Sequence, residues 1–231
     1  MGSKDLTLYS DHLMSYLNQL GPSSLVLSSG AQALGVSLSP VQLEQLAQYA
    51  MLLQKWGAVY NLTANKELSQ IVNLHLLDSL VTVPCLQREA PGLERILDVG
   101  SGAGLPGVVL SIMFPQAEVH CVDAVAKKAA FINQVAISLG LKNLHAHHRR
   151  IEAFDLEVDV ITSRAFSSLF DFVSLTQKNL RPQGVWMAMK GQVTEQELNP
   201  MASVVDVFHV EPLHVPGLDA SRNIVWMKKK G

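Results

Sequence analysis

A glycine-rich stretch in the middle of the chain is the first candidate for chemistry. It reads DVGSGAGLPG at positions 98–107 and directly follows the apolar pair Ile96-Leu97. Glycines in such a turn let the backbone approach a nucleotide closely, and free amides at the start of a following helix offer hydrogen-bond donors. Gly100, Gly102 and Gly104 are therefore candidate ligand contacts. The alternative is that the glycines make only a tight turn.

An acidic residue strengthens the nucleotide interpretation. Asp123 ends the next β-rich run, EVHCV at 118–122, about twenty residues after the glycines. A carboxylate at this place can accept hydrogen bonds from both hydroxyls of a ribose. The alternative is that Asp123 only caps the helix that follows it.

The spacing of the glycines bears on which nucleotide would bind. NAD-binding turns need G-x-G-x-x-G, whereas residues 100–104 read G-x-G-x-G and follow Asp98. This spacing resembles motif I of S-adenosylmethionine-dependent enzymes. The carboxylate of Asp98 would repel the pyrophosphate of NAD, whereas S-adenosylmethionine has no pyrophosphate and is opposed less. The same carboxylate can face the sulfonium or the amino-acid end of S-adenosylmethionine.

The elements that must position these residues follow from hydrophobic patterning. Short β-rich runs alternate with helical ones, which predicts a parallel sheet with crossover helices. The last two runs, 203–213 and 221–230, are joined by HVPGLDA, which is too short for a crossover helix, so they should pair antiparallel. That ending is typical of class I methyltransferases by analogy of fold. The other expected strands are 95–99, 118–122, 143–148, 158–163 and 184–190.

The first part of the chain reads as helical. Ser39-Pro40 supplies a cap and a first-turn proline, and apolar residues then recur at helical spacing over 43–56. A second helical run, 71–83, should stop at Pro84, and Gly140 should cap the helix over 125–139. We therefore expect an α/β fold of two parts. A helical extension (1–85) would pack on a Rossmann-like, S-adenosylmethionine-dependent methyltransferase domain (86–231) with a seven-stranded, mostly parallel sheet.

Composition limits the possible classes of protein. The chain has 231 residues, of which 48% are hydrophobic, so a sizeable core is expected. No apolar run reaches eighteen residues and the N-terminus mixes charges into its apolar positions, which predicts a cytoplasmic protein without a membrane anchor. Cys85 and Cys121 lack metal-site spacing and should be core residues. With a net charge of -2, any nucleic acid must be bound by a local basic patch.

Five segments together resemble one protein family. They are KWGAVYNLTA (55–64), HLLDSL (75–80), ILDVGSGAGLPG (96–107), SRAF (163–166) and MKGQ (189–192). In this order they are similar to the RsmG family, also called glucose-inhibited division protein B, which methylates the N7 of one guanine in bacterial 16S ribosomal RNA. Roughly the first thirty residues look like an extra segment, and Gly57 stands where the family usually has Asn.

The resemblance implies S-adenosylmethionine as cofactor and S-adenosylhomocysteine as product. The implied cofactor contacts are Gly100, Leu105, Ile151, Glu152 and Arg164. Ile151 can flank the adenine face, and Arg164 lies at the carboxyl end of the fourth expected strand, where open α/β sheets place their ligands. The alternatives are a surface ion pair for Arg164, and core packing and a solvated charge for Ile151 and Glu152.

Basic residues are the candidate RNA contacts. Phosphates need cations, and arginine can also bond to or stack on an extruded guanine. His75 and Asp78 share a helix face, which alone indicates a polar surface; the resemblance implies that they brace the cofactor or RNA edge. The tail 228–230 should fray. Because guanine N7 carries no proton, no general base is expected, and Arg164, Lys190 and His75 would only position the reactants. The expected RNA contacts are Lys127, Arg149, Arg150, Arg164 and Lys190.

Two absences narrow the chemistry. No Asn/Asp-Pro-Pro-Tyr/Phe motif follows the fourth expected strand, which disfavours amino-methylating enzymes, and neither cysteine is placed to attack a pyrimidine ring. Three alternatives stay open, namely methylation of another RNA base, methylation of a small molecule, and a non-enzymatic cofactor-binding regulator. The expected partner is 16S ribosomal RNA or a small-subunit precursor, bound by a monomer without a metal ion.

Overall fold

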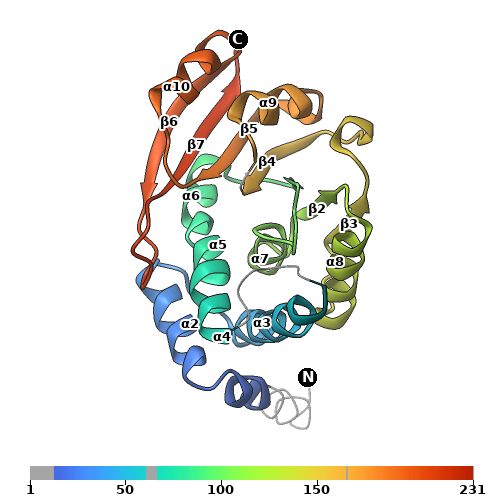
Figure 1. Ribbon diagram of the computed structural model, residues 1–231, viewed down its shortest axis with the longest axis vertical. Helices are drawn as coiled ribbons and strands as arrows, with labels where there is room; N and C mark the ends of the chain where they lie inside the picture. The colour runs from blue at the N-terminus through green and yellow to red at the C-terminus, as the bar shows by residue number, and fades with distance from the viewer. Residues whose placement is uncertain (1–12, 61–66, 165, 231) are drawn as a thin grey trace.

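The computed structural model describes residues 13–60, 67–164 and 166–230. Parts of two segments that carry the family resemblance, 61–64 and residue 165, lie outside the described residues, as do the first twelve residues of the expected extra segment. Within the described residues, a seven-stranded sheet has the order β3-β2-β1-β4-β5-β7-β6 (Figure 1). The strands are β1 (Arg95–Val99), β2 (Glu118–Asp123), β3 (Leu144–His148), β4 (Val158–Arg164), β5 (Leu180–Lys190), β6 (Val205–Leu213) and β7 (Arg222–Lys229).

This sheet confirms the predicted fold class. Strands β1 to β5 pair in parallel, and β7 pairs antiparallel with both β5 and β6. Strand β5 begins four residues earlier than expected, at Leu180, because a register shift lets its irregular start, which contains Pro182 and Gly184, remain in the sheet. The carboxyl ends of the five parallel strands therefore meet at one edge of the sheet.

Helices cover both faces of the sheet. One face carries α3 (Pro40–Tyr60), α7 (Gly107–Met113) and α8 (Ala126–Leu139), and the other carries α9 (Leu169–Thr176). The Ser39 hydroxyl accepts the Gln42 amide at 3.3 Å, which confirms the cap of α3, and Gly140 ends α8 at φ 66° as predicted. Short helices complete this part of the fold, namely η2 (Ile151–Ala153), η3 (Gln177–Asn179), α10 (Glu195–Leu198) and η4 (Asn199–Ser203).

The N-terminal helices share a core with α7 and α8. Leu46, Leu76 and Val108 belong to one buried cluster. The boundary proposed at 85/86 therefore separates two parts that pack as one hydrophobic unit. The helices that precede β1, besides α3, are α2 (Pro22–Ala33), α4 (Leu68–Ile71), the π-helix η1 (Val72–Leu77), α5 (Asp78–Leu80) and α6 (Thr82–Glu89).

The expected helix end at Pro84 is wrong. The chain turns at Val81, and α6 then runs from Thr82 to Glu89 with Pro84 in its first turn. Amides of a first turn have no partner within the helix, so a proline there removes no hydrogen bond. The helical layer thus reaches almost to β1.

Three further features concern the classes of protein considered above. In the part of the chain that the structure describes, no helix is long and apolar enough to cross a membrane. Among the same residues, no group of His, Cys, Asp and Glu could hold a metal ion. Cys85 and Cys121 are buried and free, as expected for core residues.

Candidate active site

The glycine-rich turn joins β1 to α7 in a backbone form that requires glycine. Gly100, Gly102 and Gly104 have φ angles of 67°, 60° and 89°. A Cβ added at Gly100 would meet no protein atom within 4 Å. The turn therefore presents bare backbone to open space, where a ligand can approach it closely.

The amides of this turn are already bonded within the protein. The amides of Gly100 and Ser101 donate to the Val122 carbonyl, and the amide of Val108, the second residue of α7, donates to Gly104. The amide of Gly107 donates to Asp98. The expectation of free amides at the helix start is thus wrong for Gly107 and Val108, because both amides already have partners within the protein. A pyrophosphate would find few donors here.

Asp98 is enclosed beneath the turn. Its side chain has no exposed surface, and Oδ2 accepts the Gly107 amide at 2.9 Å. Burial raises the pKa of this carboxyl to about 7, although the Gly107 amide and the charge of Arg164 oppose the shift. Asp98 therefore anchors the start of α7, and a direct contact with a cofactor stays a prediction.

Asp123 ties the end of β2 to the glycine turn. Its Oδ2 accepts the Gly102 amide at 2.9 Å, and its Oδ1 accepts the Val125 amide at 2.8 Å, just before α8. Asp123 therefore stabilises the turn into the helix, but the capping alternative is wrong in its strict form, because the N-cap of α8 is Val125 and no side chain caps this helix. Lys128 Nζ also lies 3.6 Å from Asp123 Oδ2. Each carboxylate oxygen has a second lone pair, so these interactions leave capacity for a sugar hydroxyl.

Apolar side chains lie near Asp123. The Arg149 amide donates to the Asp123 carbonyl at 3.2 Å, which brings the segment leading to Ile151 beside β2. Ile151 is buried, whereas Glu152 is exposed. Val125 is 38% exposed and was missed in the sequence, although an apolar residue two positions after an acidic strand end is a readable signal.

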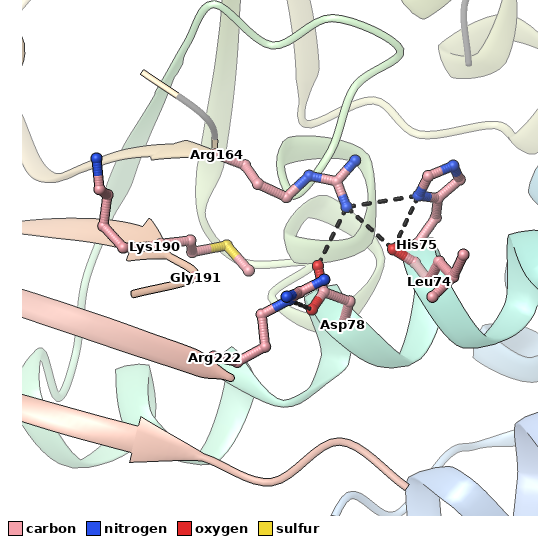
Figure 2. A pocket seen from close by; sticks show the side chains of 8 residues that line it. Leu74, His75, Asp78, Arg164, Lys190, Gly191 and Arg222 are labelled. Atoms are coloured by element: carbon pink, nitrogen blue, oxygen red, sulfur yellow. Dashed lines mark hydrogen bonds and ion pairs between the residues drawn. The ribbon is translucent and has the colours of Figure 1, made fainter. Parts of the chain in front are cut away.

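A pocket of about 460 Å³ opens at the carboxyl ends of β4 and β5 (Figure 2). Elements far apart in the sequence meet here, namely η1, α5, β4, β5 and the start of β7. The pocket brings together four residues that the sequence singled out, His75, Asp78, Arg164 and Lys190. Its full lining is Leu74, His75, Asp78, Arg164, Met189, Lys190, Gly191 and Arg222.

One buried carboxylate organises this pocket. Asp78 Oδ2 lies 3.2 Å from Arg164 Nη1, and Oδ1 lies 2.6 Å from Arg222 Nε. Two guanidinium groups face one carboxylate, so this cluster carries a net positive charge. Arg222 was missed in the sequence, but an arginine that opens the last strand of an antiparallel hairpin must lie at the edge where the parallel strands end.

Arg164 links three groups through a single nitrogen. Its Nη1 also donates to the Leu74 carbonyl at 3.2 Å and lies 3.5 Å from His75 Nδ1 (Figure 2). Arg164 is therefore a partly buried hub rather than the surface ion pair of the alternative interpretation. Burial and the neighbouring Arg164 charge lower the pKa of His75 to about 4, so this imidazole is neutral near pH 7.

Lys190 lines the pocket but is paired elsewhere. Its Nζ lies 2.7 Å from Glu197 Oε1, and Figure 2 shows the side chain pointing away from Asp78. An RNA phosphate would have to replace Glu197 at this ammonium. Its role in RNA binding stays a prediction.

The other expected RNA contacts lie outside the pocket. Lys127, Arg149 and Arg150 are exposed at the same edge of the sheet, near Asp123, where β3 ends and α8 begins. The expected RNA contacts therefore form two sets. Arg164 and Lys190 line the pocket, and Lys127, Arg149 and Arg150 form a second set, here called the edge group.

The expected fraying of the lysine tail is wrong. Lys228 and Lys229 belong to β7, and Lys228 pairs with Asp206 at 3.3 Å. The ammonium groups of Lys229 and Lys230 donate to the carbonyls of Leu180 and Ala202. Strand pairing with β5 and β6 holds Lys228 and Lys229 in place.

The sequence is similar to a family of known proteins. Residues 42–225 match the family GidB, described as rRNA small subunit methyltransferase G. A protein of that name from Methylibium petroleiphilum is 54% identical over 207 residues, 89% of this chain and 94% of its own. Another from Paracidovorax citrulli is 49% identical over 219 residues, 90% of each chain.

Solved structures support the fold. A SAM-dependent methyltransferase from Aquifex aeolicus aligns with a TM-score of 0.53 at 17% identity, covering 68% of this chain and 92% of its own. TrmN from Thermus thermophilus aligns with a TM-score of 0.51 at 18% identity, covering 69% of this chain and 53% of its own. At these identities the likeness concerns the fold alone.

Proposed function

This chain belongs to the rRNA small subunit methyltransferase G (GidB) family, and we propose that it transfers a methyl group from S-adenosylmethionine to the N7 of a guanine in bacterial 16S ribosomal RNA. The observation that carries the proposal is the adjacency of two sites. Asp98 pairs with Thr162 in the sheet. Two residues further along each strand, Gly100 and Arg164 therefore lie at neighbouring strand ends, one at the glycine turn and one in the pocket.

The glycine turn fits the cofactor. The open space above Gly100 accommodates a ligand against bare backbone, and Asp123 offers acceptors for ribose hydroxyls. Ile151 and the exposed Val125 would flank the adenine, with Gly102, Gly104, Leu105 and Glu152 as further contacts. S-adenosylmethionine supplies an electrophilic methyl group on its sulfonium.

The pocket fits a guanine. The major-groove edge of guanine presents O6 beside N7, and a guanidinium N–H can bond to O6 alone, which leaves the N7 lone pair free. Asp78 holds Arg164 and Arg222 in place, so either could bond to O6 while N7 stays directed at the methyl group. The edge group Lys127, Arg149 and Arg150 would bind RNA phosphates.

The reaction then needs placement and no proton transfer. The in-plane lone pair of N7 forms the new N–C bond as the S–C bond of the donor breaks, and N7 has no proton to lose. Positioning of this kind can contribute about 7–11 kcal/mol. His75 is neutral near pH 7 and, together with Arg164 and Lys190, serves in placement. We propose a monomer that acts in the cytoplasm on 16S RNA or a small-subunit precursor.

The test is methyl transfer into defined RNA. The purified protein and tritiated S-adenosylmethionine are incubated with 16S RNA or 30S subunits from cells that lack the gene, and the product is mapped by nuclease digestion and mass spectrometry. We expect one added methyl group on one guanine, which aniline-induced cleavage identifies as N7-methylguanine. Label on another base, only on a small molecule, or nowhere would contradict the proposal.

A further inference from the structure

A tyrosine of the helical layer reaches the glycine turn. Tyr49 of α3 has no exposed surface, and its hydroxyl donates to the Ala103 carbonyl at 2.7 Å and lies 3.2 Å from the Gly104 carbonyl. The two partners are 54 and 55 residues away in the sequence. This contact joins the part of the chain before β1 directly to the turn that would hold the cofactor.

The hydroxyl fixes the orientation of the turn's backbone. The amide of Gly104 donates to the Ser101 carbonyl at 2.7 Å. Because the carbonyl and amide of one peptide plane point in opposite directions, Tyr49 and Ser101 hold the plane between Ala103 and Gly104 from both sides. Among the described residues, only Tyr49 donates a hydrogen bond to the Ala103 carbonyl. A buried carbonyl left without a partner is costly.

Two features favour Tyr49 as a permanent donor. Burial raises the pKa of its phenol well above the usual value, with the nearby Cys121 adding to the shift, so the hydroxyl keeps its proton. The hydroxyl also fits beside the turn without crowding, since even a Cβ added at Gly104 would lie 3.4 Å from the Tyr49 oxygen, an ordinary van der Waals distance.

We propose that Tyr49 is a positioning residue that holds the glycine turn in the form that binds the methyl donor. This inference rests on the proposed function. Without the hydroxyl, the turn would spend part of its time in other arrangements, and the apparent dissociation constant rises in inverse proportion to the competent fraction.

The test is the variant Tyr49→Phe, which keeps the ring packing and removes only the hydroxyl. Calorimetric titration should show S-adenosylmethionine and S-adenosylhomocysteine each binding about three- to tenfold more weakly, the range that one buried neutral hydrogen bond supplies. The KM for the donor should rise by the same factor, whereas kcat at saturating donor and the KM for RNA stay unchanged. A merely structural role would not produce this split.

The matched control is Gln45→Met on the same helix. Gln45 Nε2 donates to the Leu139 carbonyl at 3.1 Å, so this variant also removes one bond between α3 and the core, away from the turn. We expect lower thermal stability from both variants and weaker donor binding from Tyr49→Phe alone. Hydrogen exchange gives a second measurement, since the amides of Gly104 and Leu105 should exchange faster only in Tyr49→Phe.

The outcomes separate the two proposals. If the wild type binds neither cofactor, the proposed function is wrong. If the wild type binds and Tyr49→Phe binds equally well, or if Gln45→Met weakens binding as much, the positioning role of Tyr49 is wrong. Unchanged exchange at Gly104 and Leu105 in Tyr49→Phe would also contradict it.

Discussion

Asp78 Oδ1 accepts a hydrogen bond from Arg222 Nε at 2.6 Å, across 144 residues of sequence. Its other oxygen holds Arg164 at 3.2 Å, so one carboxylate places two arginines that line the same pocket. A carboxylate shared in this way has a double function, because it offsets the repulsion between the arginines and sets where their remaining donors point.

Replacing Asp78 by Asn should affect both stability and activity. Removing one partner of a buried ion pair costs about 3–5 kcal/mol, but the two arginines are about a quarter exposed, so we expect a loss of roughly 1–2 kcal/mol in the free energy of unfolding. Misplaced arginines should lower kcat/KM by about 10²-fold. Urea unfolding and single-turnover methyl transfer measure the two effects.

A matched control is Asp206→Asn. Asp206 pairs with Lys228 at 3.3 Å on the far hairpin, where both side chains are about half exposed. We expect its stability to stay within about 0.5 kcal/mol of the wild type and its activity to be unchanged. If Asp78→Asn behaved like this control, the carboxylate would have no organising role.

Replacing Gly100 by Val should abolish cofactor binding. A valine at φ 67° is strained, and its side chain would fill the space above the turn. Gly92→Val is the control, because Gly92 has φ 73° and equally open surroundings but lies away from the turn. We expect both variants to lose about 1–2 kcal/mol of stability and only Gly100→Val to lose S-adenosylmethionine binding in calorimetry. If a folded Gly100→Val variant still bound S-adenosylmethionine normally, the cofactor would not bind at the glycine turn.

Replacing Arg150 or Lys127 by Ala should weaken RNA binding through phosphate contacts. Each lost contact lowers the slope of log K against log salt by about 0.7 to 0.9 units, while donor affinity stays nearly unchanged. Filter binding from 50 to 300 mM salt measures the slope. Lys142→Ala serves as control, since Lys142 is exposed where β3 begins, at the opposite edge of the sheet. An unaltered slope in both variants would show that Arg150 and Lys127 are solvated surface residues that do not contact RNA phosphates.

Local patterns predicted most of the fold. The limits of β1, the C-cap at Gly140 and the cap at Ser39 depend on residues within a few positions of one another, so the sequence shows them directly. The prediction at Pro84 is wrong because the effect of a proline depends on its position in the helix. A turn at Val81 lets a new helix begin at Thr82, so Pro84 lies in the first turn, where a proline is tolerated.

The contacts that complete the site are non-local. Arg222 reaches Asp78 because β7 pairs with β5 in a register that sets Lys190 opposite Asn223. That register follows from the packing of the whole hairpin. In the sequence, Tyr49 fits the apolar pattern of α3 and carries no sign of a polar role. Only the folded position of the glycine turn shows that its hydroxyl has a partner.

The pH dependence of methyl transfer tests the chemistry itself. General-base catalysis contributes about 10²–10⁴-fold and produces an acid limb near the pKa of the base. In the fold, the pKa of His75 falls from 6.5 to about 4, so His75 stays neutral, and its charge does not change, between pH 6 and 8. Asp98 does titrate in this range, because burial raises its pKa to about 7.

We nevertheless expect a flat profile. The Asp98 carboxyl is fully enclosed beneath α7 and cannot take a proton from RNA, and guanine N7 has none to give. Single-turnover rates with saturating RNA and donor at each pH should therefore vary less than about threefold from pH 6 to 8. Saturation matters because histidine titration could weaken RNA binding and imitate a catalytic limb. A tenfold fall per pH unit on the acid side, abolished by Asp98→Asn or His75→Gln with both affinities preserved, would show that a base is needed and that the methylated atom is not N7.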